Sequence, residues 1–180
     1  VRKIVSHRDG LTEIVVELEE NLFSAVNYDF FTGDVKTDDR VILNTVAMDL
    51  NLGSGGKHFV LWNLRHNSLE TFSEGHIMKL CYTPLQINCL SVEEQSSPYH
   101  ETIKDKNDLK KMPVIIGELH SQLPAVVSVI KEKNPLVKIC YLMTDGAALP
   151  IVMSNLVYRL KKLDLLDATI TIGNAFGGDF

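Results

Sequence analysis

The sequence has few cysteines, no long apolar run and no excess of positive charge, and each of these absences excludes a class of protein. Three cysteines among 180 residues, with no closely spaced pair, argue against a disulfide framework and favour reduced thiols in the cytoplasm. No apolar stretch reaches the roughly 20 residues that a membrane-spanning helix needs. The first residues also lack the apolar core of a signal peptide. We therefore expect a cytoplasmic protein without a membrane contact.

Charge excludes a second kind of partner. The chain carries 18 Lys and Arg residues against 23 Asp and Glu residues, a formal net charge of −5. A mildly acidic chain is repelled by the phosphate backbone of nucleic acids. The lysines between residues 104 and 111 are interleaved with Asp105 and Asp108, which is typical of a solvated loop rather than a basic patch. We predict no nucleic-acid partner.

The first half of the chain is rich in short strand-forming runs, each bounded by residues that favour turns. The runs are 2–6, 12–18, 22–28, 40–44, 57–62 and 76–82. This pattern predicts a β-rich domain over residues 1–90, folded as a small barrel or a curled sheet. Residues 91–112 have little apolar content, so we expect a linker or a surface excursion there.

The last third of the chain has a different period. Apolar runs of strand length alternate with stretches in which apolar residues recur at helical spacing. The strand-like runs are 113–119, 137–143 and 168–172, and the helical stretches lie around 123–130 and 149–160. Strands that alternate with helices pair in parallel through right-handed crossovers. We predict an α/β (β-α-β-α-β) domain over residues 113–180, a Rossmann-like parallel three-layer unit, within an α+β two-part chain.

Both predicted helices begin with a polar residue that is followed by proline. Ser121 precedes Pro124, and Thr144 or Asp145 precedes Pro150. Such polar side chains can cap a helix, and proline is tolerated in a first turn because its missing N–H has no helical partner there. The sequence therefore predicts Ser121 as one N-cap and either Thr144 or Asp145 as the other.

Three polar loops follow the three predicted strands, at residues 119–122, 143–147 and 173–179. The carboxyl ends of parallel strands share one edge of the sheet, and ligands bind outside it. Helix N-termini present free N–H groups there, which favours a small anionic molecule such as a phosphate, a nucleotide or a carboxylate. No Walker-type or dinucleotide fingerprint is present. The candidate ligand-binding residues are Ser121, Thr144, Gly146, Asn174, Gly177 and Gly178.

Titratable side chains in the same loops suggest chemistry as well as binding. His120 and Asp145 can act as a base with its orienting carboxylate, or can bind a metal together with Asp179. Ser121 can act as a nucleophile, although no G-x-S-x-G elbow surrounds it. Alternatively, Ser121 and Asp145 are only helix caps. The candidate catalytic residues are His120, Asp145 and Asp179, and the sequence identifies neither a metal nor a cofactor.

A glycine-rich segment in the first part, residues 53–56, is followed by Lys57 and His58. Successive backbone N–H groups in such a segment can form a concave nest that binds an anion. A flexible hairpin or a barrel corner explains the glycines without a ligand, and we prefer this structural explanation to the anion-binding nest.

Six motifs occur in order along the chain. They are Leu43-Asn44-Thr45, residues 52–60 (LGSGGKHFV), 75–80 (GHIMKL), 118–122 (ELHSQ), 143–150 (MTDGAALP) and 175–179 (AFGGD). With this set, the chain resembles an uncharacterised bacterial family that is catalogued as a domain of unknown function. The resemblance extends over nearly the whole chain and brings no established activity. Members of the family continue beyond the last motif with a further α/β portion.

One face of the predicted parallel sheet has no cover. Crossovers that step in one direction place both helices on one face, whereas residues 137–143 are apolar on both faces. We therefore expect a fragment of a longer protein, and the alternative is a homo-oligomer in which a second subunit covers that face.

These observations leave three hypotheses. The first is a hydrolase or transferase that acts on an anionic substrate at the three-loop edge, which clustering of His120, Asp145 and Asp179 favours. The second is a non-catalytic binding or regulatory protein, which an anion bound away from titratable side chains favours. The third is an assembly module that uses the apolar sheet face, which a large apolar interface favours.

Overall fold

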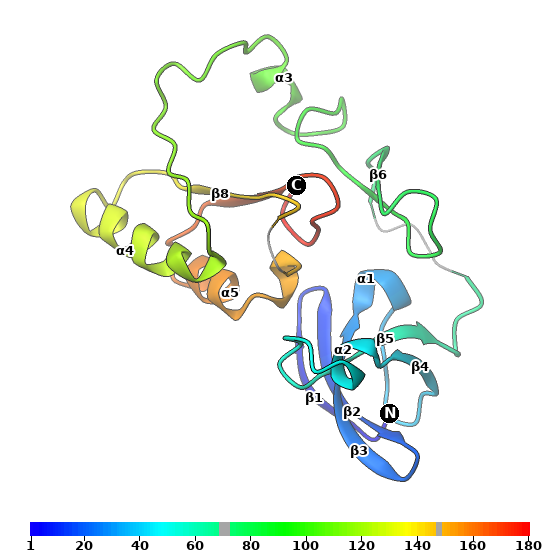
Figure 1. Cartoon of the computed structure of the whole chain (residues 1–180). Coiled ribbons are helices and arrows are strands. Elements are labelled where there is room, and N and C mark those ends of the chain that lie inside the picture. The colour runs from blue at the N-terminus through cyan, green and yellow to red at the C-terminus, as the bar shows by residue number, and fades with distance from the viewer. Residues whose placement is uncertain (69–72, 147–148) are drawn as a thin grey trace. The chain divides into compact units, whose positions relative to one another are not determined.

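The computed structural model describes residues 1–68, 73–146 and 149–180, and its structure is mixed α+β (Figure 1). The chain divides into two compact units, Val1–Thr71 and Phe72–Phe180, here called the first and second units. Within the described ranges, no helix combines the length and the apolar content needed to cross a membrane. The predicted domain boundaries, with a linker at residues 91–112, stay a prediction.

The first unit is built on a sheet of five strands. The strands are β1 (Lys3–Arg8), β2 (Leu11–Leu18), β3 (Asn21–Tyr28), β4 (Val41–Asn44) and β5 (His58–Asn63). Their order is β1-β2-β3-β5-β4, and β5 is parallel to β3 while the other neighbours are antiparallel. The short helices α1 (Asp29–Thr32) and α2 (Val46–Asp49) lie in the connections.

This sheet is open rather than closed. Strands β1 and β4 are its two edges, and they do not pair with each other. Of the two predicted alternatives, a small barrel or a curled sheet, the barrel is therefore wrong, and the β-rich character of this part is confirmed. The reason is that closure depends on the tilt and stagger of the strands, which run lengths and turn residues do not specify.

Alternating apolar side chains form the core of the first unit. Ile14 and Val16 on β2 pack with Ala25 on β3, with Val60 on β5 and with Val35, and each of the five is at most 6% exposed. Side chains two positions apart on a strand point to the same face, so the period of β2 selects this core. Burial of each larger aliphatic side chain contributes about 1.5–3 kcal/mol.

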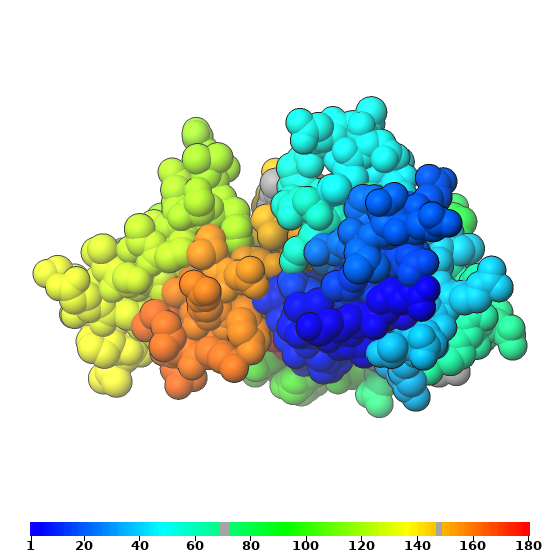
Figure 2. Space-filling model, turned by 90° about the horizontal axis from the view of Figure 1, so that it is seen from below, coloured from blue at the N-terminus to red at the C-terminus, as the bar shows by residue number. Residues whose placement is uncertain are grey.

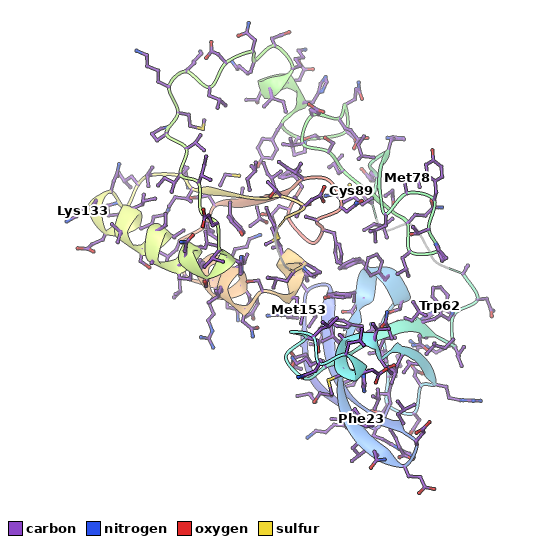
Figure 3. The ribbon with its side chains drawn as sticks, viewed as in Figure 1. Phe23, Trp62, Met78, Cys89, Lys133 and Met153 are labelled. Atoms are coloured by element: carbon purple, nitrogen blue, oxygen red, sulfur yellow. The ribbon has the colours of Figure 1, made fainter. Side chains whose placement is uncertain are left out.

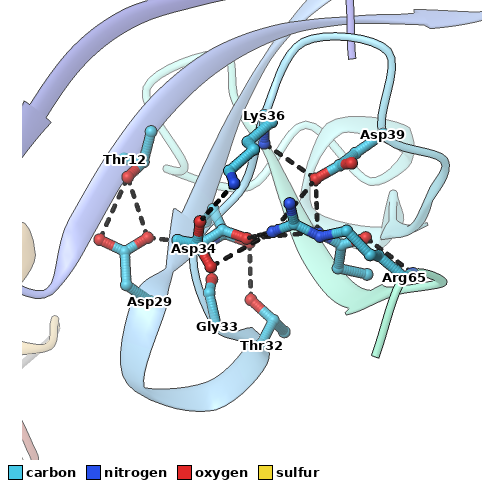
Figure 4. A network of polar contacts seen from close by, with 10 residues as sticks. Thr12, Asp29, Thr32, Gly33, Asp34, Lys36, Asp39 and Arg65 are labelled. Atoms are coloured by element: carbon cyan, nitrogen blue, oxygen red, sulfur yellow. Dashed lines mark hydrogen bonds and ion pairs between the residues drawn. The ribbon is translucent and has the colours of Figure 1, made fainter. Parts of the chain in front are cut away.

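The buried amide of Asn27 organises the turn after β3, in which Asp29, Thr32 and Gly33 are labelled in Figure 4. The Nδ2 of Asn27 donates to Asp29 Oδ1 at 2.8 Å and to the carbonyl oxygen of Gly33 at 2.9 Å. Its Oδ1 accepts from Thr32 Oγ1 at 2.6 Å, and Thr12 Oγ1 donates to the Asp29 carboxylate. Burial raises the pKa of Asp29, although the bonds from Asn27 and Thr12 oppose this effect. Every polar group of the Asn27 side chain is therefore satisfied.

The second unit contains a hairpin, several helices and a small parallel sheet. The hairpin is formed by β6 (Ile77–Lys79) and β7 (Ile87–Cys89), and the sheet by β8 (Cys140–Met143) and β9 (Ala168–Thr171). The helices are α3 (His100–Ile103), α4 (Leu123–Lys133), α5 (Asn155–Lys162) and the 3-10 turns η1 (His120–Gln122) and η2 (Ile151–Met153). Figure 3 labels Met78 and Cys89 on the hairpin.

Helices α4 and α5 pack against each other and against one face of this sheet. They lie side by side in both overall views (Figures 1 and 2, yellow-green and orange). Val127 on α4, Met143 on β8 and Val157 on α5 are at most 2% exposed and belong to one apolar cluster. The predicted parallel pairing of the last two strands is confirmed, with Cys140 beside Ala168.

The first predicted strand of the parallel unit, 113–119, is wrong. Residues 113–117 have no strand partner, and Ile116 is 91% exposed. The parallel sheet thus has two strands within the described residues instead of three. An apolar run shows that a segment can form a strand, but the run does not specify a partner for it.

The second predicted helix begins later than expected. Pro150 precedes η2, and α5 begins only after Ser154, whose Oγ accepts a hydrogen bond from Val157 N at 3.2 Å. The cap is therefore Ser154, and the prediction of Thr144 or Asp145 as the N-cap is wrong. Ser121 lies inside η1, and no capping bond from its side chain is present, so the first predicted cap is wrong as well.

The uncovered face of the parallel sheet is observed. Tyr141 and Met143 point toward the helices, whereas Cys140 and Leu142 are exposed on the opposite face, with Leu142 at 51%. The expected lack of a cover on this face is therefore confirmed for the described residues.

The turn between β2 and β3 yields a prediction on stability. Its two residues, Glu19 and Glu20, have φ of 50° and 65°, a left-handed pair that Asn and Gly adopt at lower cost. We expect the double variant Glu19→Asn/Glu20→Gly to be more stable than the wild type, with a free energy of unfolding about 1–2 kcal/mol higher. Glu20→Gln removes a charge and keeps the strain, so it is the matched control in urea denaturation. If the double variant and this control were equally stable, the proposed backbone strain at Glu19 and Glu20 would be contradicted.

Candidate functional site

The loops after β8 and β9 meet at the carboxyl edge of the parallel sheet. Met143 and Thr171 form the last registered pair of the two strands. Beyond them, Asp145 Oδ1 accepts a hydrogen bond from the backbone N–H of Asn174. Gly173 has φ of 64°, and a side chain there would collide with the Asp145 carboxylate. Asp145 therefore fixes the loop after β9 by direct contact with its backbone.

Lys79 enters this edge from the β6–β7 hairpin. Its side chain is buried, with the residue 7% exposed. The Nζ donates to Thr171 Oγ1 at 2.8 Å, to the carbonyl oxygen of Thr171 at 3.2 Å and to that of Ala175. An ammonium has three N–H bonds, so all of them are used, and every acceptor is neutral.

The charge of Lys79 is consequently not neutralised by a direct partner. Lys79 makes no ion pair with any residue in the described part of the chain. Burial lowers its pKa, while attraction from Cys89 and Asp145 acts in the opposite direction. A buried cation that is solvated only by dipoles creates a positive potential at the ends of β8 and β9.

His120 occupies a different place, on the helix-covered side of the sheet. Its Nδ1 lies 3.0 Å from Tyr141 Oη, and its Nε2 lies 2.6 Å from Ser154 Oγ. Burial lowers the pKa of His120, which favours the neutral imidazole. The ring joins η1 to β8 and to Ser154, the N-cap of α5. The predicted pairing of His120 with Asp145 is not formed, because both ring nitrogens contact other side chains.

Asp179 is held against the side of β9, away from Asp145. Its Oδ2 accepts from the backbone N–H of Thr169 at 2.8 Å and from Thr169 Oγ1 at 2.9 Å, and its Oδ1 pairs with Lys161 on α5. Burial acts to raise the pKa of Asp179, but the bonds from Lys161 and Thr169 together outweigh it and hold this pKa below its usual range. Asp179 therefore fastens the last residues to β9.

The three predicted catalytic residues are thus not brought together. Across residues 1–68, 73–146 and 149–180, no group of three or more His, Cys, Asp and Glu side chains is placed to hold a metal ion. Joint metal binding by His120, Asp145 and Asp179 therefore has no support in the geometry.

The six predicted ligand-binding residues fall into three groups, and in the last of them, Gly177 and Gly178, a side chain at Gly178 would crowd the carbonyl oxygens of Thr169 and Phe180. Thr144 and Gly146 are exposed beside Asp145, and Asn174 adjoins the same carboxylate. Ser121 is exposed in η1, on a separate segment. Gly177 has φ of 83°, and a side chain there would clash with Val152. This glycine is explained by packing against η2, without a ligand.

Lys79 and Thr171 are the polar residues of this edge that sequence reasoning missed. Lys79 lies in one of the six motifs, but it is 92 residues from Thr171. The only signal available was a lysine in a strand with otherwise apolar residues, Ile77-Met78-Lys79. That signal suggests a buried amine and does not identify its partners.

The comparisons with known proteins give a family and no function. Residues 24–180 match the sequence profile of a family described as protein of unknown function (DUF3866). The chain belongs to this family. The expected membership in a domain family of unknown function is therefore confirmed, and the matched region includes Lys79, Asp145 and the loop after β9. No curated protein and no solved structure matches the DUF3866 chain.

The contacts of His120 predict a pH-dependent stability. The pKa of His120 in the folded state lies below the value of 6.5 for an unperturbed histidine. The unfolded chain therefore binds this proton first as the pH falls, and stability is lost through the range just below 6.5. We expect the free energy of unfolding of the wild type to decrease, relative to His120→Gln, between about pH 7.5 and pH 5.

Chemical denaturation of both proteins across this pH range measures the effect. Glutamine can still bond Tyr141 and Ser154 but does not titrate, so the difference between the two curves isolates the imidazole. Parallel curves would rule out the assigned shift.

Proposed function

We propose that this DUF3866 protein binds a small anionic molecule at the carboxyl edge of the β8–β9 sheet. The edge is defined here as residues 144–146 and 173–175 together with Lys79 and Thr171. The observation that carries the proposal is the buried Lys79 ammonium, whose charge has no direct carboxylate partner. An anion at this edge would gain attraction from a cation that is already desolvated and held in place.

The composition of the edge also favours a particular kind of anion. Asp145 is exposed there and accepts one bond from Asn174 N. The other oxygen of the Asp145 carboxylate repels a bare anion, but it can accept a hydrogen bond from a hydroxyl group of a ligand. The best match is therefore a molecule that carries both an anionic group and hydroxyls, such as a nucleotide or another phosphorylated metabolite, ahead of a simple carboxylate.

The topology supports the same location. Parallel strands β8 and β9, joined through α5, agree with a Rossmann-like arrangement, in which ligands bind beyond the carboxyl ends of the strands. We propose that the two strands belong to such an arrangement. The role of the edge in binding does not depend on how many further strands the sheet has.

A hydrolase or transferase is the second candidate function, and one observation favours it. The 2.6 Å contact between His120 Nε2 and Ser154 Oγ has the geometry of a nucleophile with its base. Against this, Ser154 is 3% exposed and its Oγ already caps α5. Non-catalytic binding therefore ranks first. An activity on esters or phosphomonoesters that disappears in Ser154→Ala, while the fold is retained, would reverse the ranking.

The exposed apolar face of β8 supports a contribution to assembly, which was the third hypothesis. Cys140 and Leu142 are exposed on this face. The size of an interface on it is not defined by this chain alone, so assembly ranks below ligand binding.

A thermal-shift experiment tests the binding proposal. Inorganic phosphate, nucleoside monophosphates, phosphorylated sugars and dicarboxylates are added in turn to the chain. A ligand that binds only the folded state stabilises it by about 2.7 kcal/mol at a concentration of 100 times its Kd. We expect at least one phosphorylated compound to raise the Tm of the wild type and to have little effect on Lys79→Met.

Lys138→Met is the matched control, because it removes a lysine of the same unit whose side chain is 84% exposed. This variant should respond to the ligand as the wild type does. Lys79→Arg keeps the charge and should retain part of the response. Equal shifts in wild type and Lys79→Met, or no shift with any compound, would overturn the proposal.

A further inference from the structure

Ser54 and His58, which are close in sequence, are among the residues of the first unit that have buried side-chain polar atoms without a hydrogen-bond partner in the described part of the chain. In Ser54 the atom is Oγ, and in His58 both ring nitrogens lack a partner among the described residues. Ser54 is 8% exposed and His58 is 3% exposed. Buried polar groups in folded proteins nearly always have a partner, so each of these atoms requires an explanation.

His58 is enclosed by apolar groups at the beginning of β5. The parallel register places it beside Ala25 on β3. The ring of Phe23, labelled in Figure 3, meets the His58 ring edge-on with centroids 5.0 Å apart. A phenylalanine or leucine would suit these neighbours better than an imidazole. The choice of histidine therefore points to a polar group that the protein itself does not supply.

The segment between α2 and β5 supplies further unused donors. The backbone N–H groups of Gly53, Gly55 and Gly56 make no hydrogen bond within the described residues, whereas Ser54 N donates to the carbonyl oxygen of Leu52 at 2.6 Å. These three glycines are exposed. Next to them in sequence lie the buried Ser54 and His58.

The space around these glycines is also open. A side chain at Gly53, Gly55 or Gly56 would meet no atom within 4 Å. Gly55 and Gly56 have φ of 65° and 74°, which explains glycine at those two positions, but Gly53 does not have a positive φ. Packing and backbone conformation thus give no reason for glycine at position 53, whereas close approach of a ligand to the backbone does.

We propose that residues 53–58 form a binding site for a phosphate-type anion. The donors are three backbone N–H groups, the Ser54 hydroxyl and one nitrogen of His58, all of which suit phosphate oxygens. Lys57 adjoins the segment, but its charge is balanced by Glu13, whose Oε1 lies 2.6 Å from the Lys57 Nζ. This site shares no residue with the edge around Lys79.

Glycine-labelled protein provides a direct test. The chain has 11 glycines, so their amide signals can be followed singly in ¹⁵N–¹H spectra. Millimolar inorganic phosphate is titrated against sodium chloride of equal ionic strength, and a phosphomonoester is titrated in a parallel arm. We expect saturable shifts of Gly53, Gly55 and Gly56 with phosphate and none with chloride. Saturation by the phosphomonoester as well identifies a phosphorylated metabolite as the source, and saturation by inorganic phosphate alone identifies free phosphate.

Two variants separate binding from folding. His58→Phe suits the apolar surroundings, so without phosphate it should be at least as stable as the wild type while binding phosphate roughly tenfold more weakly or worse. Ser54→Ala should also weaken binding without unfolding the chain. Lys79→Met should leave these shifts unchanged, which keeps this test independent of the proposed function of the second unit.

Three outcomes would overturn the site. They are identical shifts with chloride, phosphate shifts that persist in both variants, and no saturable shift, the last of which would mean that only buried water satisfies Ser54 and His58.

Discussion

The buried ammonium of Lys79 is the interaction on which the candidate edge depends. It joins the β6–β7 hairpin to the end of β9 and to the carbonyl of Ala175, across as many as 96 residues of sequence. A buried charge is tolerated only when oriented dipoles replace its water. The loop after β9 must therefore keep the Ala175 carbonyl turned inward, and Asp145 holds the same loop through Asn174 and Gly173. The buried Lys79 ammonium therefore both creates the positive electrostatic potential at the edge and fixes the conformation of the loop after β9.

Most of the other polar residues near the parallel sheet have structural roles. His120 joins η1 to β8 and α5, Ser154 caps α5, and Asp179 fastens the last residues to β9. Each of these side chains uses its hydrogen-bonding groups within the protein. Side chains whose polar groups all have partners within the protein stabilise the fold, and this describes His120, Ser154 and Asp179. Lys79 differs from them, because its hydrogen bonds are complete but its charge is not balanced by a carboxylate.

The first unit offers the same contrast in a different form. Asn27 is fully buried, and its side chain forms hydrogen bonds with Asp29, Thr32 and Gly33. Ser54 and His58 are almost as deeply buried and have no such partners. A buried polar group without a hydrogen-bond partner opposes folding. The hydrogen-bonded network around Asn27 is therefore explained by its contribution to stability. For Ser54 and His58, which lack partners, our proposal is that a ligand supplies them.

The sequence by itself determined the local elements: the strands of the first unit, the amphipathic stretch of α4, the parallel pair β8 and β9, and the meeting of the loops after these two strands. Period and turn residues specify such features because they depend on neighbours along the chain. Tertiary structure alone decided that the sheet of the first unit stays open, that residues 113–117 lack a strand partner, that Ser154 caps α5, and that the buried Lys79 donates to Thr171 and Ala175. Each of these depends on which distant group satisfies a backbone edge, a helix end or a buried charge, and a pattern of residue types does not identify that partner.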